Sequence, residues 1–288
     1  MYIAPPLRRK VIEIVGAWLA PAILIGAAVA DGDTNSRQGA LRICADPNNM
    51  PFSNENEDGF ENRLARLVGA ALGQNISYLW SAQRRGFIRR TLKAGDCDIL
   101  MGVPALLDMV ETTRPYYGTS YVFVSRADRH LDITSIRDPQ LRTLRIGVQL
   151  VGDNGFNTPP AHAIAAQGMT ANVTGYMLYG DYGLANPPTA IINAVANGDI
   201  DIAAVWGPLA GYFAKHSDIA LTVTPIENTD EFAPLTFRFD IAMGVRKGDH
   251  ALRSQLDAFI ARDQPAITEL LRSYGVPLVT THASSSSQ

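Results

Sequence analysis

Three acidic side chains are the residues of this chain best suited to catalysis: Asp46, Glu55 and Asp153. An enzyme that works in a cleft needs a general acid or base held next to its substrate. None of the three stands beside a recognisable partner, and no nucleophile is paired with a histidine in the sequence. The sequence also contains no glycine-rich phosphate motif. We therefore predict a protein without catalytic residues and without a bound cofactor.

A second set of side chains is suited to binding. These residues lie in loops that follow predicted strands or precede predicted helices, which is where open α/β sheets bind ligands. The set comprises Asn48, Phe52, Trp80, Arg84, Tyr116, Tyr117, Gln149, Thr158, Tyr179 and Trp206. Such a cleft suits a small uncharged or aromatic ligand, or a peptide segment of a partner. Core packing is the alternative for each aromatic residue, and it is the preferred interpretation of Trp80.

Two members of this set have simpler explanations. Arg84 and Arg85 precede a predicted helix, so they would bind an anion together with helix N–H groups, or form a solvated basic turn. Thr158 is placed to cap the helix that Pro159 opens, which would explain it without a ligand.

The two cysteines, Cys44 and Cys97, both fall at strand-like positions in the first half of the chain. In an oxidising compartment they would form one structural disulfide, and two buried free thiols are the alternative. Neither cysteine has the spacing of a paired metal ligand, and the five histidines are scattered. No metal site is predicted.

The N-terminus has the pattern of a secretory signal. A basic group over 8–10 precedes an apolar stretch over 11–27, and Ala28-Val29-Ala30 fits the small-x-small cleavage rule. We predict a signal peptide over 1–30 that is cleaved on export to the periplasm. A retained membrane anchor is the alternative, which Glu13 inside the stretch disfavours.

The composition narrows the possible partners. The chain has 288 residues with 25 basic and 28 acidic side chains, a net charge of −3. This balance excludes the basic surface of a nucleic-acid or membrane-surface protein. No second long apolar segment follows the N-terminal one, so no membrane insertion is predicted after cleavage.

The motif Gly-Asp-x-Asp-Ile occurs twice, over 95–99 and over 198–202. Each copy follows a helix-like apolar pattern and leads into a strand-like stretch, and its glycine suits a helix end that needs positive φ. Chance is the alternative, because helix-to-strand joints favour Gly and Asp. The matching flanks favour two similar α/β lobes with a cleft between them.

The periodicity supports this organisation. Strands are predicted over 41–45, 76–80 and 99–103, a helix over 60–72 and another over 85–94. This β-α-β-α-β order implies a mainly parallel sheet covered by helices. The order begins again in the second half, with strands over 145–149, 173–179 and 202–206 and helices over 161–167 and 188–196. Two separate helices, over 249–262 and 266–274, are predicted near the end.

This order resembles that of type II periplasmic solute-binding proteins, in which the chain crosses between the lobes twice. The resemblance implies a first lobe built from 41–126 plus 237–280 and a second lobe over 132–234. The serine-rich composition of the end predicts a disordered tail over 281–288.

Five motifs are similar to those of a narrower group, the quinoprotein-dehydrogenase-associated binding proteins encoded beside methanol dehydrogenases. They span residues 44–53, 83–87, 113–117, 157–162 and 205–213. The resemblance implies a periplasmic accessory of a pyrroloquinoline-quinone (PQQ)-dependent alcohol dehydrogenase, acting in its maturation or activation. The alternative is the receptor of an ABC importer for a small ligand other than an amino acid.

One expectation separates this chain from amino-acid receptors of the same fold. Those receptors resemble one another in using an arginine to clamp the ligand carboxylate and an aspartate to hold the ammonium. Aligned on Pro115-Tyr116, the arginine position is Leu106 here, and the aspartate position is Trp206. Because buried charges without partners are costly, we predict that free amino acids do not bind.

Overall fold

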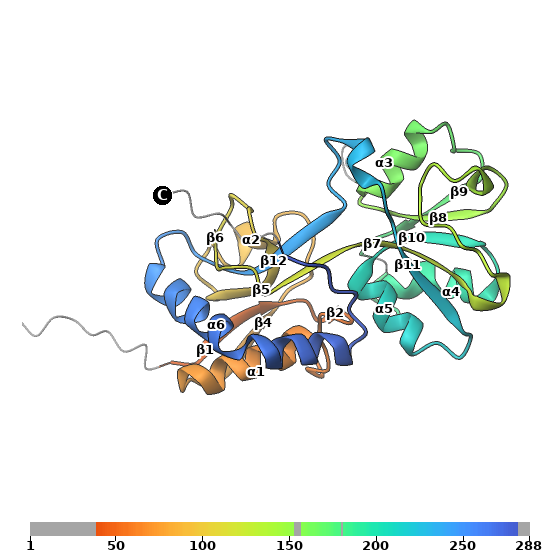
Figure 1. Ribbon diagram of the computed structural model, residues 1–288. Helices are drawn as coiled ribbons and strands as arrows, with labels where there is room; N and C mark the ends of the chain where they lie inside the picture. The colour runs from red at the N-terminus through yellow and green to blue at the C-terminus, as the bar shows by residue number, and fades with distance from the viewer. Residues whose placement is uncertain (1–38, 153–156, 180, 282–288) are drawn as a thin grey trace, which may run out of the picture. The chain divides into compact units, whose positions relative to one another are not determined.

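The first part of the chain builds the predicted β-α-β-α-β order around a parallel core (Figure 1). The computed structural model describes residues 39–152, 157–179 and 181–281. The predicted signal peptide and the tail beyond 281 lie outside this range. The described elements up to the first long antiparallel strand are β1 (Leu41–Ala45), β2 (Asn48–Asn49), β3 (Ser53–Asn54), α1 (Phe60–Leu72), β4 (Ile76–Trp80), α2 (Phe87–Arg90), β5 (Ile99–Pro104), β6 (Glu111–Thr112) and β7 (Tyr117–Arg126).

The second part repeats this arrangement. Its elements are η1 (Ala127–Arg129), η2 (Pro139–Arg142), β8 (Ile146–Leu150), α3 (Pro159–Ala166), β9 (Val173–Met177), η3 (Pro187–Thr189), α4 (Ala190–Asn197), β10 (Ile202–Trp206), α5 (Gly207–Lys215), β11 (Leu221–Pro225) and η4 (Thr229–Phe232), where η marks a 3₁₀ helix. The chain then returns through β12 (Arg238–Val245) and ends its regular structure with α6 (His250–Ser273).

Two long strands join the two parts into one sheet with the order β4-β1-β5-β12-β7-β10-β8-β9. β1 pairs in parallel with β4 and β5, and β8 pairs in parallel with β9 and β10. The central strands β7 and β12 run antiparallel to each other and to their outer neighbours β10 and β5. Figure 1 shows β7 and β12 running between the two groups of parallel strands.

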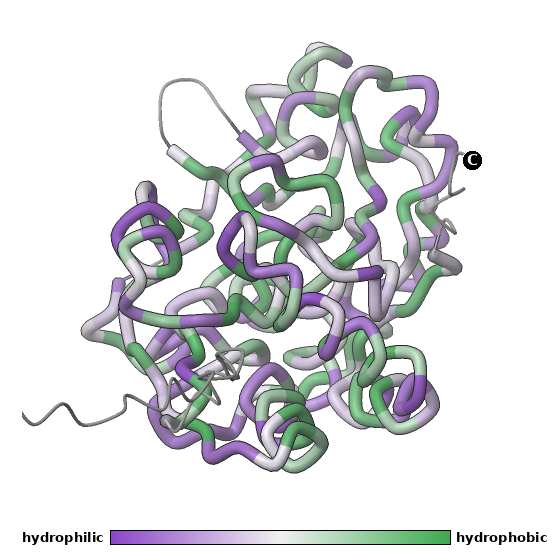
Figure 2. The backbone as a smooth tube through the Cα atoms, turned by 90° about the vertical axis from the view of Figure 1, so that its left-hand side faces the viewer, coloured by the Kyte–Doolittle hydropathy of each residue, from purple (hydrophilic) through white to green (hydrophobic). Residues whose placement is uncertain are grey.

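Buried apolar side chains form clusters on both faces of each group of strands. Alternate residues of β1 point to opposite faces of the sheet. Leu41 and Ile43 pack toward α1 and α6, whereas Cys44 packs toward α2. Figure 2 shows hydrophobic (green) and hydrophilic (purple) stretches interspersed along the backbone. β7 serves both parts, because Tyr117 joins the first core while Phe123 joins the second. The lobe boundaries themselves stay a prediction.

The two predicted C-terminal helices are in fact one helix, and that expectation was wrong. α6 runs unbroken from His250 to Ser273 with Pro265 inside it. Proline normally interrupts a helix because it lacks the N–H group. Here buried Ile260, Ile267 and Leu271 continue one apolar face against the first core, so packing outweighs the lost hydrogen bond.

The helix predicted over 85–94 is also shorter than expected. Only Phe87–Arg90 is helical, and turns lead from there to Gly95. The Thr91 hydroxyl donates to the carbonyl of Phe87 at 2.7 Å, and Leu92 is fully buried. Cys97 then reaches Cys44, with 5.4 Å between the Cα atoms, and the predicted disulfide is confirmed.

The repeated Gly-Asp-x-Asp-Ile motif forms the same clamp in both parts. The second aspartate, Asp98 or Asp201, accepts hydrogen bonds from the backbone N, the Nε and the Nη2 of one arginine, at 2.8–3.1 Å. That arginine is Arg42 in β1 for the first copy and Arg145, just before β8, for the second. Each motif thus ties the start of its strand to the start of a neighbouring strand, and Gly95 and Gly198 have the predicted positive φ of 85° and 77°.

These clamps make folding stability sensitive to acid. Burial opposes ionisation of Asp98, but hydrogen bonds from Arg42 and Arg246 outweigh it and lower its pKa from 3.8 to about 2. Hydrogen bonds from Arg145 lower the pKa of Asp201 as well, against a smaller effect of burial. A carboxylate with a lowered pKa stabilises the fold above its unfolded pKa, and this contribution disappears as the pH falls through the folded value.

We expect Asp98→Asn to lower the free energy of unfolding by about 2 kcal/mol at pH 7, after allowance for solvent around Arg42. Thermal unfolding followed by circular dichroism should show a melting temperature about 4–8 °C lower. The loss should shrink as the pH falls from about 4 to about 2, because the unfolded wild-type aspartate takes up its proton at about pH 4 and the folded one only at about pH 2. Asp96→Asn changes an exposed residue of the same motif and serves as the control. Equal losses in the two variants would contradict the clamp.

Candidate functional site

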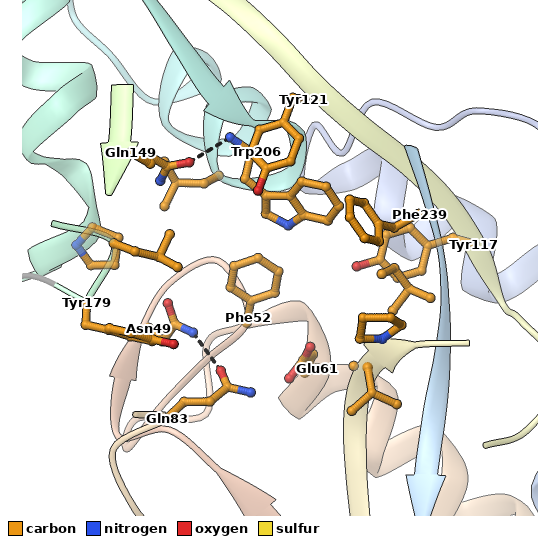
Figure 3. Close-up of a pocket in the computed structure, with 17 residues that line it drawn as sticks. Asn49, Phe52, Glu61, Gln83, Tyr117, Tyr121, Gln149, Tyr179, Trp206 and Phe239 are labelled. Carbon is orange, nitrogen blue, oxygen red and sulfur yellow. Dashed lines mark hydrogen bonds between the residues drawn. The ribbon is translucent and has the colours of Figure 1, made fainter. Parts of the chain in front are cut away.

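A cavity of about 440 Å³ lies where β5, β12, β7 and β10 meet the loops after β1, β4 and β9. Its walls are mainly apolar and include six aromatic rings, which Figure 3 shows gathered around one space. The aromatic lining residues are Phe52, Tyr117, Tyr121, Tyr179, Trp206 and Phe239. Asparagine and glutamine side chains and one acid, Glu61, complete the polar part of the lining.

The strand register explains why these rings meet. Tyr117 and Tyr121 are four residues apart on β7, and the period of two places them on the same face. Tyr117 pairs with Ile241 of β12, and Tyr121 pairs with Trp206 of β10. The Trp206 ring then contacts Tyr121 and Phe239 edge-on, with centroids 5.1 and 5.6 Å apart. Residues from distant parts of the chain therefore form one aromatic wall.

Buried polar groups fix the end of β10. The Gln149 side-chain oxygen accepts a hydrogen bond from the backbone N–H of Trp206 at 2.9 Å. The Thr158 hydroxyl in turn donates to the Gln149 carbonyl at 2.6 Å. Thr158 is the N-cap residue of α3, which begins at Pro159 as predicted, but its side chain makes no capping hydrogen bond. The hydrogen bond from its hydroxyl to the Gln149 carbonyl instead connects the start of α3 to β8.

The structure brings five of the predicted site residues together at the cavity. These are Phe52, Tyr117, Gln149, Tyr179 and Trp206. The other predicted positions lie elsewhere. Tyr116 is 1% exposed and donates its hydroxyl proton to the Met101 carbonyl at 2.8 Å, so it belongs to the core. Tyr116 and Tyr117 are adjacent on an extended chain, and therefore only one of them can face the cavity.

Asn48 and Arg84 contact a single segment beside the cavity. The Asn48 amide donates to the Leu184 carbonyl at 2.9 Å, and the Arg84 guanidinium lies 4.7 Å from the centre of the Tyr182 ring. Trp80 stacks on Tyr78 with centroids 4.6 Å apart, as the packing interpretation expects.

Asp46, considered above as a catalytic acid, has a structural place. It is 2% exposed, and its carboxylate accepts hydrogen bonds from the backbone N–H of Asn48 at 2.8 Å and of Gln83 at 2.6 Å. The Tyr182 hydroxyl donates to the same carboxylate. Asp46 therefore holds three loops together rather than facing the cavity. Glu55 is exposed, and Asp153 lies outside the described residues.

Sequence reasoning missed several residues of the lining, including Asn49, Glu61, Gln83, Tyr121 and Phe239. Asn49 donates its amide to Gln83 at 3.2 Å, which joins two loops at the cavity edge. Strand periodicity could have found Tyr121, because it is four residues from Tyr117. No local pattern marks Glu61, since acids are common in the first turn of any helix.

Glu61, the one acid on the described lining, has a raised pKa. Burial, and then the nearby negative charge of Asp46, raise its pKa to about 8. Burial, and then Glu61, also raise the pKa of Tyr117 well above its usual value. No Arg, Lys or His occurs among the described residues that line the cavity. The site therefore offers acceptors and aromatic faces, and no cation to hold a carboxylate.

The position of the amino-acid clamp agrees with this description. Leu106, at the expected arginine position, is 94% exposed and does not line the cavity. Trp206, at the expected aspartate position, does line it. Across the described ranges, no three side chains of His, Cys, Asp or Glu come together as a metal ion would require. None of the described helices is both long and apolar enough to cross a membrane.

The continuous sheet with two crossing strands and a cavity beside them defines a solute-binding protein of the two-lobed type II fold. The sequence model of the bacterial extracellular solute-binding proteins, family 3, matches residues 41–275. The chain is 31% identical over 256 residues to Protein MoxJ of Methylorubrum extorquens, covering 84% of this chain and 82% of that protein. It is 27% identical over 285 residues to Protein MoxJ of Paracoccus denitrificans, covering 93% and 97%.

Among solved structures, the periplasmic binding protein XoxJ from Methylobacterium extorquens AM1 is similar with a TM-score of 0.70 and 30% identity. The match covers 84% of this chain and 100% of that one. The chain therefore belongs to family 3 of the extracellular solute-binding proteins, in the group that contains MoxJ and XoxJ. The resemblance inferred from the motifs is confirmed at this level.

Free glutamine and glutamate at 10 mM are expected to leave the melting temperature within about 1 °C of the ligand-free value. A ligand at a hundred times its Kd would add roughly 2.7 kcal/mol of stability, which is several degrees for a chain of this size. The expectation follows from the absence of a cation on the described lining. A fluorescence thermal-shift assay checks it, and a rise of several degrees would show that a carboxylate partner exists.

Proposed function

We propose that this chain is a periplasmic accessory protein that assists maturation or activation of a PQQ-dependent methanol or alcohol dehydrogenase. It would be exported with a signal peptide over 1–30 and would itself carry out no catalysis. The observation that carries the proposal is the cavity lining. The cavity lies where α/β sheets bind ligands, but its described lining has aromatic rings and no cation. Membership of the group that contains MoxJ and XoxJ supports the same function.

The cavity favours a partner segment over a free amino acid. Aromatic rings provide much of the energy of protein–protein contacts, and the amides of Asn49, Gln83 and Gln149 provide hydrogen bonds to a peptide backbone. Exposed Leu184 and Met177 add apolar surface on the segments around β9 and its following loop. In this proposal, the cavity holds a flexible segment of the apo-dehydrogenase, so that the enzyme stays competent to take up its quinone and its metal ion.

Deletion of the gene in a strain that produces the dehydrogenase should lower the PQQ content per purified dehydrogenase several-fold. The physical reason is that the unassisted apo-enzyme lacks the contact that keeps its cofactor site open. Absorbance of the quinone and dye-linked alcohol oxidation measure the effect. Restoration by the wild-type gene is the control, and full PQQ content and activity in the deletion strain would contradict the proposal.

A pull-down from periplasmic extract, with the purified mature chain as bait, tests where the partner binds. We expect Trp206→Ala to reduce recovery of the dehydrogenase at least tenfold, because this variant removes the largest ring of the wall. Leu67→Ala, an exposed apolar residue on α1, is the matched control. Both baits must first unfold at temperatures close to wild type. Recovery of an ABC permease in place of the dehydrogenase would favour the importer receptor.

A further inference from the structure

Glu61 has no function in the fold that the other contacts reveal. It lies in the first turn of α1, next to fully buried Phe60, and its side chain lines the cavity. Figure 3 shows its carboxyl group near Phe52, on the side of the cavity opposite Trp206. Within the described ranges, this carboxyl group makes no hydrogen bond and no ion pair. The Glu61 side chain is partly exposed, so its carboxyl group is open to a partner that enters the cavity.

The backbone opposite Glu61 leaves room for its carboxyl group. A Cβ atom added to Gly102 of β5 would lie 2.3 Å from the Glu61 Oε1 atom. Any larger residue at position 102 would therefore displace the carboxyl group, while the flexible side chain could move at little cost to the fold. Gly102 thus leaves space for the Glu61 carboxyl group on this side of the cavity, next to the apolar residues of β5.

The aromatic rings of the lining present faces with the same electrostatic sign as the Glu61 carboxylate. Aromatic faces carry negative potential, and the edge-on contacts of Trp206 with Tyr121 and Phe239 leave ring surface turned toward the cavity. The Asn49 side-chain oxygen adds a further acceptor, whereas the Gln83 oxygen already accepts a hydrogen bond from the Asn49 amide at 3.2 Å. The described lining includes no Arg, Lys or His, so no basic side chain there pairs with Glu61.

The groups around Glu61 also disfavour its negative charge while the cavity is empty. Burial and the charge of Asp46 raise its pKa to about 8, so most molecules carry the protonated acid at pH 7. The neighbouring Tyr116 and Tyr117 hydroxyls are neutral there, because burial first and then other negative charge raise their pKa values. A cation in the cavity would supply the missing partner, and Glu61 would then release its proton.

We propose that this cavity binds an alkylated ammonium cation, with the Glu61 carboxylate as its counter-ion and the rings of Phe52, Tyr121 and Trp206 around its alkyl groups. Aromatic rings combined with an acid are the recognised means of binding such cations. The cation would come from a free amine or from a lysine side chain of a bound segment. The cavity would have this selectivity whether or not a dehydrogenase is the partner. Sequence reasoning expected an uncharged ligand because it did not place Glu61 at the site.

Isothermal titration of the purified mature chain with choline and with its uncharged isostere, 3,3-dimethylbutan-1-ol, tests the charge requirement. Choline should bind at least tenfold more tightly than the alcohol. Its affinity should rise roughly twentyfold from pH 6.5 to pH 8.5, because a group with a pKa of about 8 becomes ionised over this range. Choline keeps its charge throughout, so the change reports on the protein.

Two variants identify the counter-ion. Glu61→Gln should weaken choline binding at pH 8.5 at least tenfold and remove its pH dependence, whereas Glu55→Gln, at an exposed position, should do neither. Gly102→Ala keeps the acid but displaces it, and should weaken binding without lowering the melting temperature by more than a few degrees.

Capped lysine, with both termini blocked, distinguishes the source of the cation. Binding of capped lysine alone would assign the cation to a protein segment, and binding of choline alone would assign it to a free amine. The proposal is overturned if neither cation binds more tightly than 3,3-dimethylbutan-1-ol, or if Glu61→Gln binds choline as wild type does. The outcome of these binding experiments does not depend on the deletion test of the accessory function, so the two proposals can fail separately.

Discussion

The antiparallel pairing of β7 with β12 is the constraint on which the rest of the structure depends. The chain leaves its first group of parallel strands through β7 and returns to that group through β12, so the two strands hold both groups in one sheet. Their register also sets the cavity wall, since Tyr117 lies opposite Ile241 and Tyr121 lies opposite Trp206 on the next strand. A shift of one residue in either strand would turn these rings to the other face.

The two ends of this sheet carry different charged side chains. Four arginines are bound by the two motif aspartates: Arg42 and Arg246 by Asp98, and Arg129 and Arg145 by Asp201. They stabilise the starts of strands, at the end of the sheet where the parallel strands begin. The cavity at the other end receives aromatic rings, amides and Glu61. The described lining of this end therefore carries one acidic side chain and no basic one.

Sequence reasoning was wrong where long-range packing overrode a local signal. Pro265 predicts a helix break, yet the apolar face of α6 continues past it because the first core accepts that face. Thr158 has the position of a helix cap, but the Gln149 carbonyl of β8 is the stronger competitor for its hydroxyl. Tyr116 and Tyr117 are neighbouring residues of the same type, and only the register of β7 decides that Tyr117 faces the cavity.

The sequence by itself determined most of the order of strands and helices, the repeated motif that marks two similar parts, the family, and five of the residues that line the cavity. These follow from local periodicity, turn residues and short motifs, which are properties of neighbouring residues. Only the tertiary structure decided that Asp46 holds loops together, that Gly102 makes room for Glu61, and that Phe239 joins the aromatic wall. Each of these depends on strands and loops that are distant in sequence and meet only when the sheet has formed.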